Sequence, residues 1–210
     1  MPPMRREPVV NISEHHVQLF DSSRSLAETV GDFLLAGFNA GEDVLVVATA
    51  QHRDLLTRHL EARGVNVRNA QLANRIVMLD ALQTLDKFMR QDVPNTAAFQ
   101  EVVGGLVARM SNGKRVRVYG EMVDLLAAKG NYKGALQLEE LWNDLGRRES
   151  FNLFCGYASG HFGDPRTAKA LAAICAAHGH LHRKSDDLLA EFLLDQPDVR
   201  SSRGGAPSGS

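Results

Sequence analysis

HHVQLFDSSRSL, from His15 to Leu26, is the stretch that decides the fold, because it joins an apolar run to a serine-rich turn. Residues 15–20 have the composition of a β-strand, and Asp21 or Ser22 can cap a helix that is predicted to continue to about residue 39. Residues 43–48 then form a nearly continuous apolar run, which is typical of a strand buried on both faces. A strand, a helix and a second buried strand in this order predict a parallel pair joined by a right-handed crossover.

The same alternation of strands and helices continues along the chain. Apolar runs predict further strands at residues 75–80, 114–119 and 151–157. Helical periodicity is found at residues 49–63, 81–90, 95–111, 121–128, 132–146 and 165–194. The predicted fold class is therefore α/β, a three-layer domain whose mostly parallel central sheet has helices on both faces.

The two ends of the chain differ in composition from the region between them. Residues 1–11 contain three of the seven prolines and are predicted to be a disordered N-terminus. Residues 197–210 end in GGAPSGS and are predicted to be a flexible C-terminal linker or tail. Residues 12–196 then form one domain of ordinary size.

The charge and the cysteine content exclude several classes of protein. The 210 residues carry 24 basic and 25 acidic side chains, so no direct contact with nucleic acid is expected. Two cysteines do not make a disulfide framework, and the N-terminus lacks the apolar core of a secretory signal. The apolar runs are shorter than the roughly 18 residues of a membrane span. These observations predict a cytoplasmic protein without membrane contact.

The turn after the first strand cannot form the phosphate cradle of an NTPase. A P-loop needs glycines that turn backbone N–H groups toward the phosphates, a lysine for the terminal phosphate and a hydroxyl for magnesium. The turn DSSRSL contains neither glycine nor lysine, and its one cation is Arg24. The hydroxyls of Ser22 and Ser23 at a helix N-terminus could hold one anion weakly. The alternative interpretation is that Asp21, Ser22 and Ser25 only cap the helix.

Sequence motifs of cofactor binding and of catalysis are missing as well. The GxGxxG pattern of a dinucleotide site does not follow any predicted strand. The GxSxG elbow of a nucleophilic serine is absent from the sequence, and a catalytic triad is not indicated. We therefore predict no cofactor and no enzymatic activity.

Ligands of parallel α/β proteins bind beyond the carboxyl ends of the strands, so residues at those ends are the candidate binding residues. Arg117 and Glu121 allow two interpretations, a polar pair that recognises a ligand or a structural ion pair of Arg117 with a carboxylate such as Glu121 or Glu139. Trp142 follows the helical spacing of neighbouring leucines and is expected in the core. The predicted ligand-binding residues are Asp21, Ser22, Ser23, Arg24, Thr49, His52, Arg117, Glu121 and Tyr157.

A metal site near the end of the chain is a weaker alternative. Cys175, His178 and His182 would lie near one another on a helix that continues to residue 194. Zinc takes such ligands but needs a fourth, and histidines at a solvated helix end are the favoured explanation of the pattern. A bound metal is therefore not predicted.

Several blocks of the sequence resemble the MEDS domain, the methanogen/methylotroph DcmR-type sensory domain. They occur in the family order over about residues 14–182, and the most specific is VRVYGEMVDLL at residues 116–126. Residues 15–49 also resemble the opening of a RecA/KaiC-type ATPase domain without its P-loop. The other blocks are HHVQLFD (15–21), FLLAGFNAGE (33–42), VATAQHR (47–53), LDA with TLDKFM (79–81 and 84–89), LEELWN (138–143) and FCGY (154–157).

This resemblance implies a RecA-like fold without ATPase motifs and a role in sensing a small molecule, such as one derived from a hydrocarbon. It also implies a partner or fused module that receives the signal: a histidine kinase, a response regulator or a transcription regulator. Self-association into a homo-oligomer is a further option. Two other functions stay open, a divergent nucleotide-binding or phosphotransfer protein and an interaction scaffold that needs no ligand.

Overall fold

A parallel β-sheet runs through the centre of the computed structural model, which describes residues 14–111 and 113–181. Within these residues the sheet has six strands in the order β3-β2-β6-β7-β1-β8, and every neighbouring pair is parallel. The strands are β1 (His15–Phe20), β2 (Asp43–Ala48), β3 (Ile76–Asp80), β6 (Val116–Gly120), β7 (Phe151–Ala158) and β8 (His180–Leu181).

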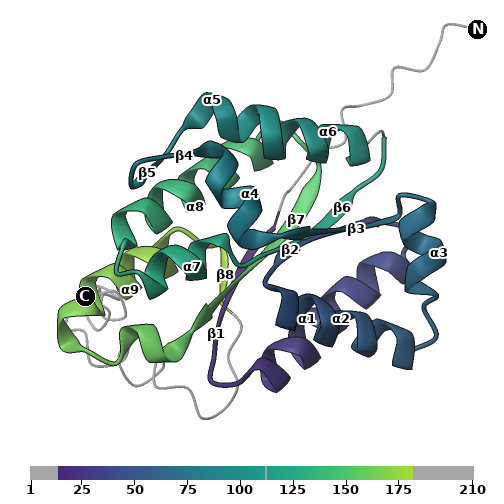
Figure 1. The fold of residues 1–210 in the computed structure, drawn as a ribbon, viewed down its shortest axis with the longest axis horizontal. Coiled ribbons are helices and arrows are strands. Elements are labelled where there is room, and N and C mark those ends of the chain that lie inside the picture. Colours follow the sequence, from purple (N-terminus) through teal and green to yellow (C-terminus); the bar gives the residue numbers. More distant parts are fainter. Residues whose placement is uncertain (1–13, 112, 182–210) are drawn as a thin grey trace, which may run out of the picture.

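Helices cover both faces of this sheet, which makes the domain three layers thick (Figure 1). One face carries α1 (Ser23–Asn39), α2 (Ala50–Ala62) and α3 (Val67–Leu72). The other face carries α4 (Ala81–Phe88), α5 (Thr96–Phe99), α6 (Gly105–Ser111), α7 (Met122–Ala128), α8 (Tyr132–Gly146) and α9 (Ala168–Ala176).

Side chains alternate between the two faces along each strand, so the sheet separates two hydrophobic clusters. Val17, Cys155 and Tyr157 belong to the cluster under α8, in which Trp142 is buried as predicted. Phe154, the neighbour of Cys155 in β7, belongs to the cluster under α1 and α2. This alternation decides which polar side chains of the strands can meet.

Polar side chains determine where several helices begin. The Ser22 hydroxyl accepts a hydrogen bond from the backbone N–H of Ser25 (3.2 Å), which confirms the predicted cap of α1. The carboxylate of Asp80 caps α4 in the same way. Because α1, α2, α4 and α7 each follow a parallel strand directly, their N-termini gather at the carboxyl edge of the sheet.

The predicted fold class is confirmed, and the strands at 15–20 and 43–48 have the predicted bounds. The predicted helix 81–90 ends at Phe88, because Met89–Arg90 (β4) pairs with Val93–Pro94 (β5) in a short hairpin. A π-helical turn at Gln100–Gly104 interrupts the predicted helix 95–111. Helix α3 was not predicted, because its six residues are too few to show a helical period.

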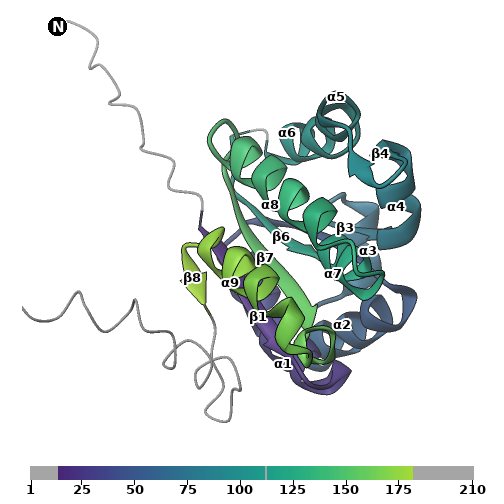
Figure 2. The ribbon, with the colours of Figure 1, turned by 90° about the vertical axis from the view of Figure 1, so that its left-hand side faces the viewer.

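Of the predicted helical segment, residues 165–194, the described part up to residue 181 is α-helical only at Ala168–Ala176 (α9). Short 3₁₀ turns cover Ser159–Phe162 and Pro165–Thr167, and α9 ends at Ala176. The chain then turns back to the sheet, where the N–H of Gly179 donates to the carbonyl of His15 (3.1 Å) and β8 pairs with β1 (Figure 2). Pairing with the edge of the sheet therefore replaces the helical hydrogen bonds in this segment.

The predicted terminal segments, residues 1–11 and 197–210, lie outside the described residues, as do residues 182–196. Within the part of the chain that is described, every helix is too short or too polar to cross a membrane.

Candidate functional site

A buried carboxylate lies at the carboxyl end of β6. Glu121 is only 1% exposed, and its Oε2 accepts a hydrogen bond from the backbone N–H of Thr49 (2.7 Å). Its Oε1 accepts from the hydroxyl of Tyr119 (2.8 Å) and contacts Nδ1 of His52. Burial and the adjacent carboxylate together raise the pKa of Tyr119 well above its ordinary value, so this hydroxyl stays protonated and continues to donate.

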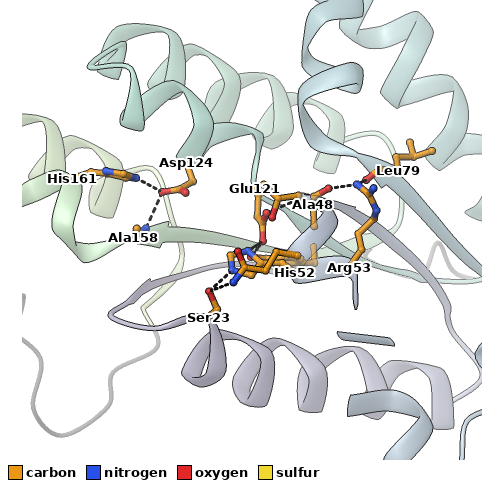
Figure 3. Close-up of polar contacts among 12 residues, drawn as sticks. Ser23, Ala48, His52, Arg53, Leu79, Glu121, Asp124, Ala158 and His161 are labelled. Atoms are coloured by element: carbon orange, nitrogen blue, oxygen red, sulfur yellow. Dashed lines mark hydrogen bonds and ion pairs between the residues drawn. The ribbon is translucent and has the colours of Figure 1, made fainter. Parts of the chain in front are cut away.

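His52 connects this carboxylate to the start of α1. Its Nδ1 contacts Glu121, and its Nε2 lies 2.9 Å from the hydroxyl oxygen of Ser23. The hydrogen bond with Glu121 raises the pKa of His52, although burial opposes this shift. We call Ser23, His52 and Glu121 the strand-end relay; Figure 3 shows His52 between the other two side chains.

The backbone holds the three members of the strand-end relay in place. Ser23 is the first residue of α1, directly after the cap residue Ser22. His52 lies in the first turn of α2, which begins at Ala50. The N–H of Glu121 donates to the carbonyl of Val47 (2.9 Å), which extends the pairing of β6 with β2 to this residue. Parallel pairing thus brings the ends of β1, β2 and β6 to one place.

Two further ion pairs line the same edge of the sheet, and Figure 3 shows the one between Asp124 and His161. Asp124 of α7 accepts from the N–H of Ala158 (2.8 Å) and pairs with Nε2 of His161 (3.2 Å). Burial raises the pKa of Asp124. On the other side of the relay, Arg53 donates to the Asp80 carboxylate (3.0 Å). These pairs join α7 to β7 and α2 to β3, so the edge is polar over several strands.

The structure brings together four of the predicted ligand-binding residues: Ser23, Thr49, His52 and Glu121. The others at the first turn have different roles. Ser22 caps α1, Asp21 accepts a hydrogen bond from the hydroxyl of Ser159, and the side chain of Arg24 is 90% exposed and pairs with Glu28 (3.2 Å).

Arg117 and Tyr157, which were predicted to bind the ligand, contact other groups. Arg117 pairs with Glu42 and donates to the carbonyl of Phe33 (3.3 Å), so it forms a structural ion pair, as the second interpretation expected, but with a different partner from Glu121 or Glu139. The reason is its position: Arg117 lies opposite Val44, toward the amino ends of the strands. Tyr157 points to the α8 side of the sheet, where its hydroxyl donates to Glu139 (2.7 Å).

The weaker alternative was a metal site formed by Cys175, His178 and His182. It required one helix through all three residues, and α9 ends before His178. Because α9 stops at Ala176, His178 lies beyond it, and His182 lies outside the described residues. His178 instead faces Glu139, with 3.3 Å between Nε2 and Oε1. Sequence reasoning did not group His178 with the three residues beside it, His15, Glu139 and Cys155.

The strand-end relay has the order hydroxyl, imidazole, carboxylate that also occurs in catalytic triads. No local motif marks its hydrogen bonds, because the three side chains come from three elements. Ser23 and His52 are 29 positions apart, and His52 and Glu121 are 69 positions apart. A search for polar residues that directly follow parallel strands does find all three, although it does not reveal their hydrogen bonds.

Fold and site together define a class of protein: a parallel α/β domain with a polar site at the carboxyl ends of its strands and without a P-loop at its first turn. Residues 14–178 match the family model of the MEthanogen/methylotroph, DcmR Sensory domain, abbreviated MEDS. The chain belongs to this family of sensory domains, and the resemblance noted in the sequence is confirmed.

Among solved structures, the chain is similar to a KaiC-like protein from the hyperthermophilic archaeon Pyrococcus horikoshii, with 13% sequence identity and a TM-score of 0.44. The similarity covers 70% of this chain and 62% of the other, so the chain spans less than two thirds of the length of that protein. No curated protein matches the chain.

Proposed function

We propose that this MEDS domain is a non-catalytic cytoplasmic sensor that binds a small molecule beside the strand-end relay and passes the signal to a signalling partner. The family match supports a sensory role in general. The observation that carries the proposal is the hydrogen-bonded chain from the buried carboxylate of Glu121 through His52 to Ser23, which lies where parallel α/β proteins bind ligands.

The relay favours a ligand with an oxygen acceptor, such as a ketone, an alcohol or a carboxylic acid. In the charged form that Glu121 stabilises, His52 donates Nδ1–H to the carboxylate and Nε2–H to the oxygen of Ser23. The amide of Gln51 also donates to that oxygen (3.4 Å). The hydroxyl proton of Ser23 is then directed away from both donors and is available to a ligand oxygen.

The relay also offers a route for a signal. Ser23 begins α1, Thr49 directly precedes α2 and Glu121 directly precedes α7, so one hydrogen-bonded chain touches the start of three helices. A ligand that draws Ser23 away from His52 would weaken the contact of His52 with Glu121 and shift the start of α2. We expect the receiver of this shift to be a histidine kinase, a response regulator or a transcription regulator.

Catalysis by the relay is the second candidate function, and the triad-like order of its groups favours it. A general base must accept the proton of the attacking hydroxyl. A triad carboxylate raises the pKa of its histidine in the same way, so the raised pKa of His52 does not separate the two functions. We propose a sensor instead of a hydrolase because the family match is to a sensory domain.

Thermal shift and native mass spectrometry with a panel of small ketones, alcohols and carboxylic acids test the proposal. We expect at least one compound to raise the Tm of the wild-type protein, and Ser23→Ala and His52→Gln to abolish this shift. Arg58→Ala changes an exposed residue further along α2 and should retain it.

Three results would overturn the proposal. Tight binding of ATP with Mg²⁺ in calorimetry would indicate a nucleotide-binding protein. Hydrolysis of p-nitrophenyl acetate that depends on Ser23 would indicate an enzyme. A partner captured equally well with and without every compound of the panel would indicate an interaction scaffold.

A further inference from the structure

Four side chains of the types that bind transition metals meet on the α8 face of the sheet. His15 begins β1, Cys155 lies in β7, Glu139 is on α8, and His178 follows α9. One nitrogen, sulfur or oxygen atom from each lies within 4.8 Å of all the others. We call these four residues the buried cluster, because the side chains of His15, Glu139 and His178 are at most 10% exposed and Cys155 is fully buried.

Three donor atoms of the buried cluster lie at the separations of one face of a tetrahedral site, and one donor atom from each of the four residues lies within 4.8 Å of the others. His15 Nε2 lies 3.2 Å from Oε2 of Glu139 and 3.3 Å from Sγ of Cys155. Sγ lies 3.3 Å from the same carboxylate oxygen, and His178 Nε2 lies 3.3 Å from its Oε1. Zinc bonds of about 2.0–2.3 Å to nitrogen, oxygen and sulfur correspond to tetrahedral edges of about 3.3–3.8 Å.

Both imidazoles are held with Nε2 as the metal-binding atom. Nδ1 of His178 donates to the carbonyl of Ile174 (2.6 Å), because a carbonyl oxygen can only accept. The amide nitrogen of Asn143 donates to the carbonyl of Ala177 (3.0 Å), so its oxygen faces Nδ1 of His15 (2.8 Å). A proton on each Nδ1 leaves an Nε2 lone pair on each ring, directed into the buried cluster.

His178 Nε2 supplies an independent indication that the buried cluster binds a metal ion. The atom is buried and has no hydrogen-bond partner among the described residues, although the side chain of His178 is 0% exposed. The nearby Oε1 of Glu139 lies at ion-pair distance and is outside the geometry of a hydrogen bond. A buried nitrogen without a partner is costly, and a metal ion would satisfy it.

The charges of the buried cluster match a divalent cation. A Cys155 thiolate and a Glu139 carboxylate carry two negative charges, and two neutral imidazoles add none. A dication therefore makes the site electrically neutral, which a buried site requires. A soft thiolate and two imidazoles suit zinc better than magnesium or calcium, and zinc also binds carboxylate oxygens.

We infer that the buried cluster is a tetrahedral site for a divalent transition metal of the zinc class, with His15, Glu139, Cys155 and His178 as ligands. Asn143 orients His15, and the hydroxyl of Tyr157 holds Glu139. A cavity of about 770 Å³, lined in part by His15, Asn143 and His178, lies beside the site and offers an entry path.

The position of this metal indicates its role. His178 follows α9, whereas the other ligands belong to the sheet and to α8. Coordination would therefore attach the chain after α9 to the sheet, just before β8 pairs with β1. The metal site shares no residue with the strand-end relay, so this inference does not depend on the proposed binding of a small molecule.

Metal analysis of the full chain tests this inference. We expect purified wild-type protein to contain about one equivalent of zinc or iron, and the protein stripped with a chelator to bind Co²⁺ with a thiolate-to-cobalt absorption band in the near ultraviolet. Cys155→Ser should remove that band. Cys175→Ser is the matched control and should retain it, because Cys175 lies outside the buried cluster.

Asn143→Ala should weaken Co²⁺ binding about 10- to 100-fold without removing the band, as expected for a group that only orients a ligand. The inference is overturned if the wild-type chain holds no metal and shows no saturable Co²⁺ band, a result that needs no variant to fold. It is equally overturned if Cys175→Ser, and not Cys155→Ser, removes the band.

Discussion

Replacement of Glu121 by glutamine tests the strand-end relay most directly. The carboxylate accepts from the N–H of Thr49 and the hydroxyl of Tyr119, and it contacts Nδ1 of His52. Glutamine has nearly the same size, so the substitution creates no cavity. It replaces one acceptor oxygen by an NH₂ group and removes the charge, and the effect can be worked out from the hydrogen bonds.

The glutamine oxygen can keep one donor, the N–H of Thr49. Its NH₂ group then faces Tyr119 and His52, which can accept only after the hydroxyl rotates and the imidazole loses its proton. Hydrogen bonds to a charged group contribute about 1.5–3 kcal/mol each, and this rearrangement recovers part of the loss. We therefore expect Glu121→Gln to lower the free energy of unfolding by about 2–3 kcal/mol.

Urea denaturation, followed by the fluorescence of Trp142, measures this change; Trp142 is the one tryptophan in the chain. Glu140→Gln, at an exposed position of α8, should change the free energy of unfolding by less than about 0.5 kcal/mol. Titration of His52 by NMR is a second readout, and its pKa should fall toward the ordinary value in Glu121→Gln. An equally small effect of both substitutions, or an unchanged His52 pKa, would refute the relay.

Other consequences of the structure can be measured separately. The raised pKa of His52 means that the stability it contributes is fully present below its unfolded pKa of about 6.5 and is lost as the pH rises through its folded pKa. The difference in unfolding free energy between wild type and His52→Gln should therefore shrink from acidic to alkaline pH in urea denaturation, and a difference that grows with pH contradicts this sign. Trp142→Ala should lower the free energy of unfolding by about 3–5 kcal/mol, because the side chain is 1% exposed. Denaturation followed by circular dichroism measures this change, and a decrease below about 1 kcal/mol would mean that Trp142 is not in the core. A Cβ at Gly37 would lie 2.1 Å from Cγ of Arg117, so Gly37→Ala should lower the free energy of unfolding by about 1–3 kcal/mol in thermal denaturation. Gly160→Ala is the control and should have little effect, because the added Cβ meets no atom within 4 Å. Equal effects of the two substitutions would refute the steric argument.

Local patterns in the sequence were enough for much of the fold. Apolar runs gave the bounds of β1 and β2, and the serine after β1 predicted the cap of α1, because both depend on residues that are near one another in the chain. The strand-end site was predictable for a similar reason. Parallel crossovers place successive strand ends at one edge, so Ser23, His52 and Glu121 were expected to lie near one another.

Segments stabilised by distant partners were predicted poorly. The last predicted helix failed because hydrogen bonds to His15 and pairing with β1 determine the path after Ala176. The hairpin at residues 89–94 and the π-helical turn at residues 100–104 interrupt helical patterns that continue in the sequence. At the end of α9, tertiary contacts thus outweigh a local preference, whereas the hairpin pairs residues that are close in the sequence.

The sequence by itself thus determined the five longer strands of the sheet, most of the helices between them, the family resemblance and the absence of a P-loop. Only the tertiary structure decided the partners of the buried polar groups: Arg117 with Glu42, and His15 with Cys155, 140 positions away. The physical reason is that the order of strands in the sheet and the face toward which each side chain points determine which groups meet. Neither the order of the strands nor the face of each side chain can be read from the pattern of a single segment.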